Sequence, residues 1–168
     1  MQNSADLTFD SLVRRYRQPL TSAACHLCGD RDAAQDVVQE TLLDAYRGFD
    51  GLREFEKAGA WLYAILRRKA IAYRRTQRPE VELTDECAAP QPSDAEHLIR
   101  GIVIEQMSRL SDEDREILAG KYLLGLSYKE LAESLGIKEG AVRVRSLRAK
   151  MRLGDILRGV GVEVPRKR

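Results

Sequence analysis

Apolar residues recur three or four positions apart along most of this chain, and no convincing stretch alternates apolar with polar residues. The first stripe contains Phe9, Leu12, Val13, Tyr16 and Leu20. A period of about 3.6 residues places such side chains on one face of an α-helix, whereas a half-buried β-strand needs a period of two. The sequence therefore predicts an all-α protein.

Two further stripes precede residue 78. One, on a helix opening near Asp32, contains Val37, Val38, Leu42, Ala45, Tyr46 and Phe49; the other contains Trp61, Leu62, Ile65, Leu66 and Tyr73. Three amphipathic helices between about residues 6 and 76 can close on one another as a small bundle. We expect residues 1–78 to form an N-terminal helical domain.

The next stretch, residues 79–95, has a different composition. It contains Pro79, Pro90 and Pro92, which cannot donate helical hydrogen bonds, and four acids between residues 80 and 86. Connections inside compact domains are typically about 4 to 6 residues long, so this one indicates a domain boundary. We interpret it as a flexible acidic linker, followed by a second small helical domain (96–158) and a tail (159–168).

Two capping motifs predict helix starts in the second domain. Ser111 with Asp114, and Ser127 with Glu130, both match the S-x-x-[DE] pattern of a capping box. In that box the hydroxyl and the carboxylate satisfy free backbone amides of the first turn. Helices should therefore begin near Asp112 and Tyr128.

The segment LAESLGIKEGAVRVR (131–145) predicts a helix-turn-helix corner. Gly136 permits the left-handed turn, and Ile137 closes the corner between two helices. The second helix buries Val142, Ser146, Ala149 and Leu153, and it turns outward Arg143, Val144, Leu147, Arg148 and Lys150. In a helix-turn-helix this face enters the major groove, where arginine pairs with guanine and apolar groups contact thymine methyls. An ordinary helical hairpin with a basic outer face is the alternative.

Charge is segregated along the chain, although the formal net charge is only +2. Lys and Arg number 13 against 10 acids in residues 1–78, 2 against 10 in residues 79–114, and 13 against 6 in residues 115–168. Basic patches at both ends favour a polyanionic partner, because phosphate attraction depends on local charge. Solvated helix faces are the alternative interpretation.

Two sets of charged residues lie on the predicted N-terminal helices. Asp36, Glu40 and Asp44 form an acidic stripe, with Gln39 alongside, and a solvated acidic face is its alternative interpretation. The third helix is basic: residues 59–79 contain no acid and include Arg67, Arg68, Lys69, Arg74, Arg75 and Arg78. Residues seven apart share a helix face, which suits tracking a phosphate backbone.

Two long segments resemble one family. LSDEDREILAGKYLLGLSYKELAESLGIKEGAVRVRSLRAK is similar to region four of bacterial sigma factors of the extracytoplasmic-function type, and DRDAAQDVVQETLLDAYRGFD with AGAWLYAILRRKAIAYRR is similar to region two. The resemblance implies a promoter-specificity subunit that binds core RNA polymerase, recognises the minus-35 and minus-10 promoter elements and assists DNA opening. It also implies an anti-sigma factor as a partner, no catalysis and no cofactor.

The resemblance assigns roles to residues by their place in these motifs. Polymerase binding falls to Asp36, Gln39 and Glu40, minus-35 recognition to Arg143, Val144, Leu147, Arg148 and Lys150, and minus-10 contact to Phe55, Arg67, Arg68, Lys69, Arg74 and Arg75. A loop near residues 52–57 would hold a flipped base, whereas we interpret Trp61 as a core residue. The chain departs from the family at two places. Arg67-Arg68 replaces a common Arg-Asn pair, and Ser146 and Leu147 stand where the family commonly has an apolar residue followed by a polar one.

Cys25, His26 and Cys28 are close in sequence, with Cys87 in the linker. A zinc or redox site is one interpretation, but buried free cysteines are favoured, because His26 points away from the face that Cys25 and Cys28 share.

The remaining alternatives concern class and location. No apolar run of 18 residues and no secretory signal are visible, so we expect no membrane insertion and a cytoplasmic location. An autonomous dimeric regulator would leave the acidic and basic N-terminal helices unexplained, and no P-loop, HExxH or nucleophile elbow supports an enzyme.

Overall fold

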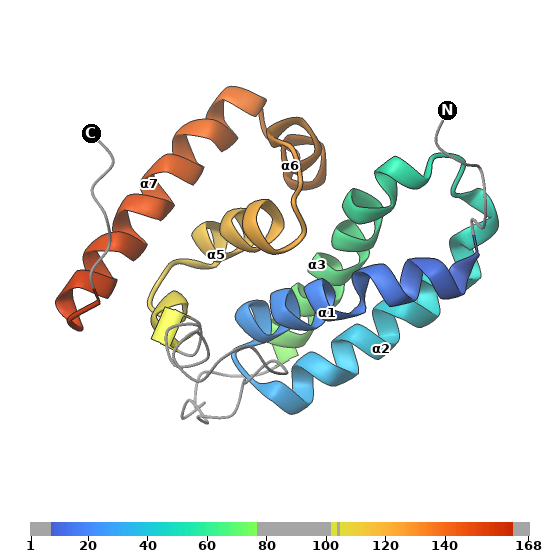
Figure 1. Cartoon of the computed structure of the whole chain (residues 1–168), viewed down its shortest axis with the longest axis horizontal. Helices are drawn as coiled ribbons and strands as arrows, with labels where there is room; N and C mark the ends of the chain where they lie inside the picture. The colour runs from blue at the N-terminus through green and yellow to red at the C-terminus, as the bar shows by residue number, and fades with distance from the viewer. Residues whose placement is uncertain (1–7, 77–101, 104, 163–168) are drawn as a thin grey trace.

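A computed structural model describes residues 8–76, 102–103 and 105–162, and every regular element within these ranges is helical (Figure 1). The N-terminal half contains α1 (Phe9–Cys28), α2 (Arg31–Gly48), the short 3₁₀ turns η1 (Phe49–Gly51) and η2 (Phe55–Lys57), and α3 (Ala58–Thr76). The C-terminal half contains α5 (Asp112–Leu118), the π-helical turn η3 (Ala119–Leu123), α6 (Tyr128–Leu135) and α7 (Glu139–Gly159). The all-α prediction is confirmed.

Local capping fixes where the first helices begin and end. The hydroxyl of Thr8 accepts a hydrogen bond from the backbone N–H of Ser11, which starts α1. That helix ends at Gly29, whose φ of 74° is the left-handed conformation that glycine adopts without steric cost. Asp30 then caps α2 by accepting from the N–H of Asp32. The sharp α1–α2 corner therefore follows from two consecutive local signals, the glycine and the aspartate cap.

The C-terminal half uses serine caps, as predicted, but only one is a full capping box. At Ser127 both reciprocal bonds to Glu130 form. At Ser111 the hydroxyl accepts from the N–H of Asp114, whereas the carboxylate of Asp114 pairs with Arg152 on α7 at 2.5 Å. The expectation of a second reciprocal box is therefore wrong, because Asp114 is buried between α5 and α7 and bonds across them instead.

The two halves pack on each other. In Figure 1, α5 lies between α7 on one side and the α1–α3 bundle on the other. One core cluster includes Leu12 and Leu62 from the first half and Leu131 and Val142 from the second. At the junction a Cβ on Gly120 would lie 2.5 Å from Cδ2 of Leu131, so only glycine fits without displacing that side chain.

Several expectations fall outside the described residues, namely the acidic linker (79–95) and most of the tail. The described part of the tail shows that α7 continues to Gly159. Among the described helices, none is long and apolar enough to cross a membrane.

Candidate nucleic-acid interface

The predicted helix-turn-helix corner is formed by α6 and α7. Gly136 follows α6 with a φ of 68°, and its N–H bonds the carbonyl of Ala132. The N–H of Ile137 bonds the same carbonyl at 3.1 Å, which closes the corner. Leu131 and Val142 are fully buried where the two helices meet. This packing holds α7 at a fixed angle with one face outward.

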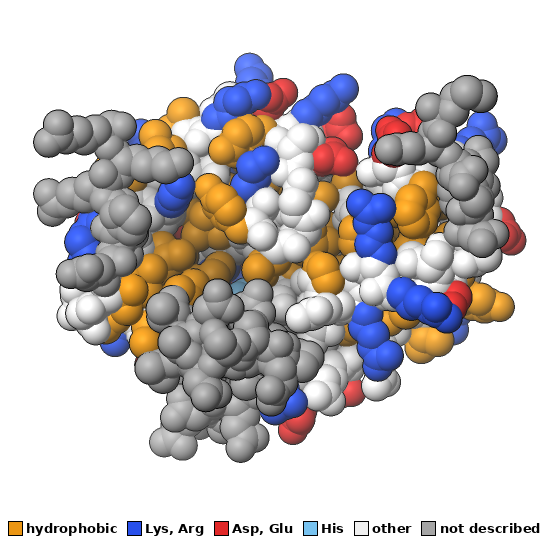
Figure 2. Space-filling view, in the orientation of Figure 1, with side chains coloured by type: hydrophobic (Ala, Val, Ile, Leu, Met, Phe, Trp, Pro, Cys, Tyr) orange, Lys and Arg blue, Asp and Glu red, His pale blue; other side chains and the backbone are white. Residues whose placement is uncertain are grey.

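The outward face of α7 contains the residues that sequence spacing predicted. All five are exposed: Arg143, Val144, Leu147, Arg148 and Lys150. Ser146 is 2% exposed and Leu147 60% exposed, so the serine packs inward and the leucine faces solvent. Basic and hydrophobic side chains lie next to one another where α7 begins (Figure 2). The face can donate hydrogen bonds to base edges and also contact methyl groups.

Arg143 is held in place by two neighbours. Its Nε lies 3.1 Å from a carboxylate oxygen of Glu139, one turn earlier on α7. Its guanidinium lies 4.8 Å from the ring centroid of Tyr128 on α6, and Lys121 lies 4.6 Å from the same ring. A cation over an aromatic face at an exposed site contributes about 0.5–1 kcal/mol. The corner therefore orders this arginine before any ligand arrives.

The acidic stripe lies on the outer face of α2. Asp36, Gln39 and Glu40 are all exposed. Leu43 and Tyr46 continue the same face, four and seven residues after Gln39, and are 56% and 67% exposed. The prediction that Tyr46 belongs to the apolar stripe of the core is wrong: the side chain faces solvent, and its ring meets that of Phe9 in a T-shaped arrangement with the centroids 5.2 Å apart.

Sequence reasoning missed Leu43 as a functional candidate. The available signal was its place three residues after Glu40 on a face otherwise assigned to charged residues. Exposed apolar groups inside a polar rim are typical of protein-binding surfaces.

Lys69 of α3 faces α2. Its ammonium lies 2.8 Å from a carboxylate oxygen of Asp44 and 3.3 Å from one of Glu40. The hydrogen bond from Lys69 lowers the pKa of Asp44, and the same bond raises the pKa of Lys69. Both groups are therefore charged at neutral pH, and Lys69 is already engaged with a residue of the acidic face.

The other basic residues of α3 fall into two sets. Arg68 and Arg75 are exposed. Arg67 and Arg74 lie on the neighbouring face, where each pairs with the buried Glu116 of α5 at 2.8 Å. The expected shared face for Arg67 and Arg74 exists, but in this arrangement it packs against the C-terminal half. Arg78 lies outside the described residues.

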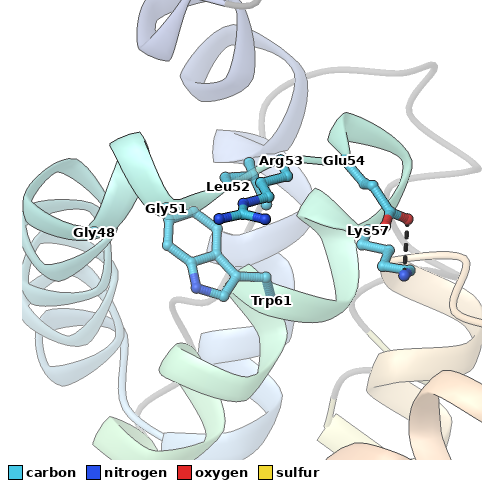
Figure 3. A pocket seen from close by; sticks show the side chains of 7 residues that line it. All are labelled: Gly48, Gly51, Leu52, Arg53, Glu54, Lys57 and Trp61. Carbon is cyan, nitrogen blue, oxygen red and sulfur yellow. Dashed lines mark ion pairs between the residues drawn. The ribbon is translucent and has the colours of Figure 1, made fainter.

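The loop between α2 and α3 forms a pocket of about 410 Å³ (Figure 3). Trp61 and Arg53 lie at one end, and Lys57 and Glu54 form an ion pair at 2.7 Å at the other. Phe55 does not line it, because its ring packs on the core with Arg15 lying 5.9 Å from its centroid. Trp61 packs on the core, as expected, and it also lines this pocket.

The cysteine motif lies at the end of α1. Cys25 and Cys28 are partly buried and no disulfide joins them to each other, whereas His26 is 6% exposed. Within the described residues no group of three His, Cys, Asp or Glu side chains could hold a metal ion, and Cys87 lies outside them.

These observations define a class of helical protein with an exposed basic helix-turn-helix face on α7 and a second, acidic face on α2. The sigma-70 region 2 model matches residues 12–80, and the sigma-70 region 4 model matches residues 100–153. Over 159 residues the chain is 34% identical to the ECF RNA polymerase sigma factor SigL of Mycobacterium tuberculosis, covering 90% of each chain. It is 33% identical over 148 residues to EcfG of Rhodopseudomonas palustris, covering 86% of this chain and 82% of that one.

Solved structures are also similar to this chain. Sigma factor RpoE of Bartonella quintana, in complex with the anti-sigma factor NepR, matches with a TM-score of 0.76 and 25% identity, covering 89% of this chain and 96% of that one. CnrH, in complex with the cytosolic domain of CnrY, matches with a TM-score of 0.66 and 27% identity, over 90% and 88%.

The chain belongs to the extracytoplasmic-function family of RNA polymerase sigma factors. It is a promoter-recognition subunit of RNA polymerase, and it performs no catalysis of its own.

Proposed function

We propose that the chain docks on core RNA polymerase through the outer face of α2. Asp36, Gln39 and Glu40 form the polar part of this surface, and the exposed Leu43 supplies its apolar centre. A few apolar anchors surrounded by polar residues carry most of the binding energy in protein interfaces. The acidic residues steer the approach to a basic partner surface and fix the register.

The minus-10 element is contacted by α3 and the loop before it. Arg68 and Arg75 are exposed and lie seven residues apart on one face, which suits a phosphate backbone. The pocket beside Trp61 accepts a base that leaves the duplex, since an indole and a guanidinium both offer flat surfaces for stacking. Stacking there offsets part of the few kcal/mol that unpairing costs.

The minus-35 element is read by α7. Arg143, Arg148 and Lys150 donate to base edges or phosphates, and Val144 and Leu147 contact methyl groups in the major groove. Contacts from α7 to base edges give sequence specificity, whereas contacts from α3 to phosphates position the DNA strand.

An anti-sigma factor restrains the chain. The similar RpoE structure contains the anti-sigma factor NepR, and the similar CnrH structure contains the cytosolic domain of CnrY, which supports this assignment. The chain acts in the cytoplasm, where polymerase is found.

The observation that carries this proposal is the presence, in one sigma-family chain, of an exposed acidic and apolar face on α2 and an exposed basic face on α7. Pull-down with purified core polymerase tests it. Glu40→Ala should weaken the complex, whereas Glu105→Ala, which removes an exposed acid outside this face, should not. Equal retention of both variants would contradict the docking face, and tight DNA binding without any polymerase complex would indicate an autonomous regulator.

A further inference from the structure

Glu116 on α5 is a buried acid that holds two arginines of α3. Its side chain is 6% exposed. One carboxylate oxygen accepts from Nε of Arg67 at 2.8 Å, and the other accepts from Nη2 of Arg74 at 2.8 Å. The carboxylate of Asp112, one turn earlier on α5, lies 2.8 Å from Nη1 of Arg74. A single turn of the C-terminal half thus neutralises one basic face of the N-terminal half.

The same two arginines belong to the predicted DNA-contacting set, and they are less accessible than the others. Their side chains are 24% and 19% exposed, whereas Arg68 and Arg75 face solvent. Guanidinium groups bind carboxylate and phosphate oxygens with the same charge-assisted geometry. A carboxylate seated on Arg67 and Arg74 therefore occupies the place that a phosphate would take.

We propose that Glu116 acts as an internal phosphate mimic: it keeps Arg67 and Arg74 from nucleic acid until α5 separates from α3. This inference rests on the proposed role of α3 at the minus-10 element. It assigns to the chain an autoinhibitory contact made from its own two halves.

The contact does not block the other proposed surfaces. The acidic face of α2 is exposed, and α2 packs chiefly on α1 and α3. The outer face of α7 is exposed as well. The closed chain can therefore dock on polymerase while Glu116 still holds the two arginines of α3.

The closed arrangement is held by more than charge. The hydroxyl of Tyr63 donates to the backbone carbonyl of Glu116 at 2.5 Å, and burial raises the pKa of Tyr63, which keeps this donor protonated. Arg67 also donates to the carbonyl of Ser134 on α6 at 3.4 Å. Buried ion pairs must be desolvated, so their net contribution is small, but loss of one partner leaves buried charges unpaired. Replacing Glu116 should therefore open the interface.

The test measures binding of the free, full-length chain to a short fluorescent single-stranded DNA by anisotropy. Glu116→Gln should bind about tenfold more tightly than the wild type, because a closed population lowers apparent affinity by the open fraction. Each additional phosphate contact on a single strand adds about 0.7 to the salt slope, so two contacts should steepen it by about 1.4. Glu105→Gln, an exposed acid with the same charge change, should alter affinity less than about twofold. Equal gains in both variants would overturn the inference.

Arg74→Ala, made in both backgrounds, supplies a second readout. If Glu116 masks Arg74, this change should weaken binding by Glu116→Gln severalfold and should not weaken binding by the wild type, in which Arg74 makes no contact with DNA. The same loss in both backgrounds, or a loss in neither, would overturn the inference, since a purely structural pair predicts no such dependence.

Solution scattering covers the case in which Glu116→Gln does not fold. With the DNA contrast-matched in neutron scattering, the radius of gyration of the wild-type protein itself should increase when the oligonucleotide binds, and an unchanged protein radius would overturn the inference. Polymerase pull-down separates the two proposals: retained polymerase binding with unaltered DNA affinity in Glu116→Gln rejects only the mimic. A wild-type chain that does not bind polymerase rejects the proposed function.

Discussion

Acidification should destabilise this protein through His26, which is buried where α1 meets α5. The side chain is 6% exposed, and its Nδ1 has no hydrogen-bond partner among the described residues. Burial, reinforced by the charge of Arg115, lowers the pKa of His26 from 6.5 to about 4. Arg115 is close because its guanidinium donates to the backbone carbonyl of His26 at 3.4 Å. The folded protein therefore holds a neutral imidazole at physiological pH.

Because burial lowers the pKa of His26, acid destabilises the folded protein. Below pH 6.5 the imidazole of His26 binds a proton in the unfolded chain but stays neutral in the folded chain. The free energy of unfolding therefore falls as pH drops from about 6.5 toward 4, and His26 has no effect on it above pH 6.5. One pKa unit corresponds to about 1.4 kcal/mol, so His26 should cost about 1 kcal/mol between pH 7.5 and 5.5 and about 3 kcal/mol by pH 4.

Urea unfolding of the wild type and of His26→Leu, at pH 7.5 and 5.5, measures this contribution. Both chains keep the same carboxylates and His97, so the difference between their pH dependences isolates His26. The wild type should lose about 1 kcal/mol more than the variant over this range. Parallel losses would show that His26 titrates normally, and would refute its burial against α5.

Three further changes test the two exposed faces and the corner. Arg148→Ala should weaken binding to a minus-35 duplex by about 1–3 kcal/mol at fixed salt in a gel-shift assay, and an unaltered affinity would remove this arginine from the reading face. Leu43→Ala should lower polymerase affinity by about 1–2 kcal/mol without altering unfolding, because the side chain is 56% exposed; unchanged affinity would exclude it as an anchor. Ser127→Ala deletes the capping box and should cost about 1 kcal/mol in urea unfolding, whereas no loss would show that the box contributes nothing.

Local signals predicted most of the fold. The helix starts at Ser111 and Ser127 and the turn at Gly136 each depend on a few consecutive residues, so sequence alone identifies them. The outward face of α7 was predictable for the same reason: a helix buried at Val142 and Ala149 must expose Arg148.

Contacts between the halves could not be predicted in this way. Arg67 and Glu116 are 49 residues apart, and no periodicity in either segment specifies their pairing. The helical pattern placed Arg67 and Arg74 correctly on one face, but it cannot tell a face that meets DNA from one that meets α5. Tyr46 was misassigned because its spacing fits the apolar stripe, but the neighbouring Ala45 takes the fully buried position and Tyr46 faces solvent.

Run-off transcription with purified core polymerase, from a promoter selected for this chain, tests the central claim most directly. The account predicts a discrete transcript that requires the chain and is lost when both Glu40 and Arg148 are replaced by alanine. Absence of any chain-dependent transcript, together with no complex between the reduced chain and polymerase at low salt, would contradict it.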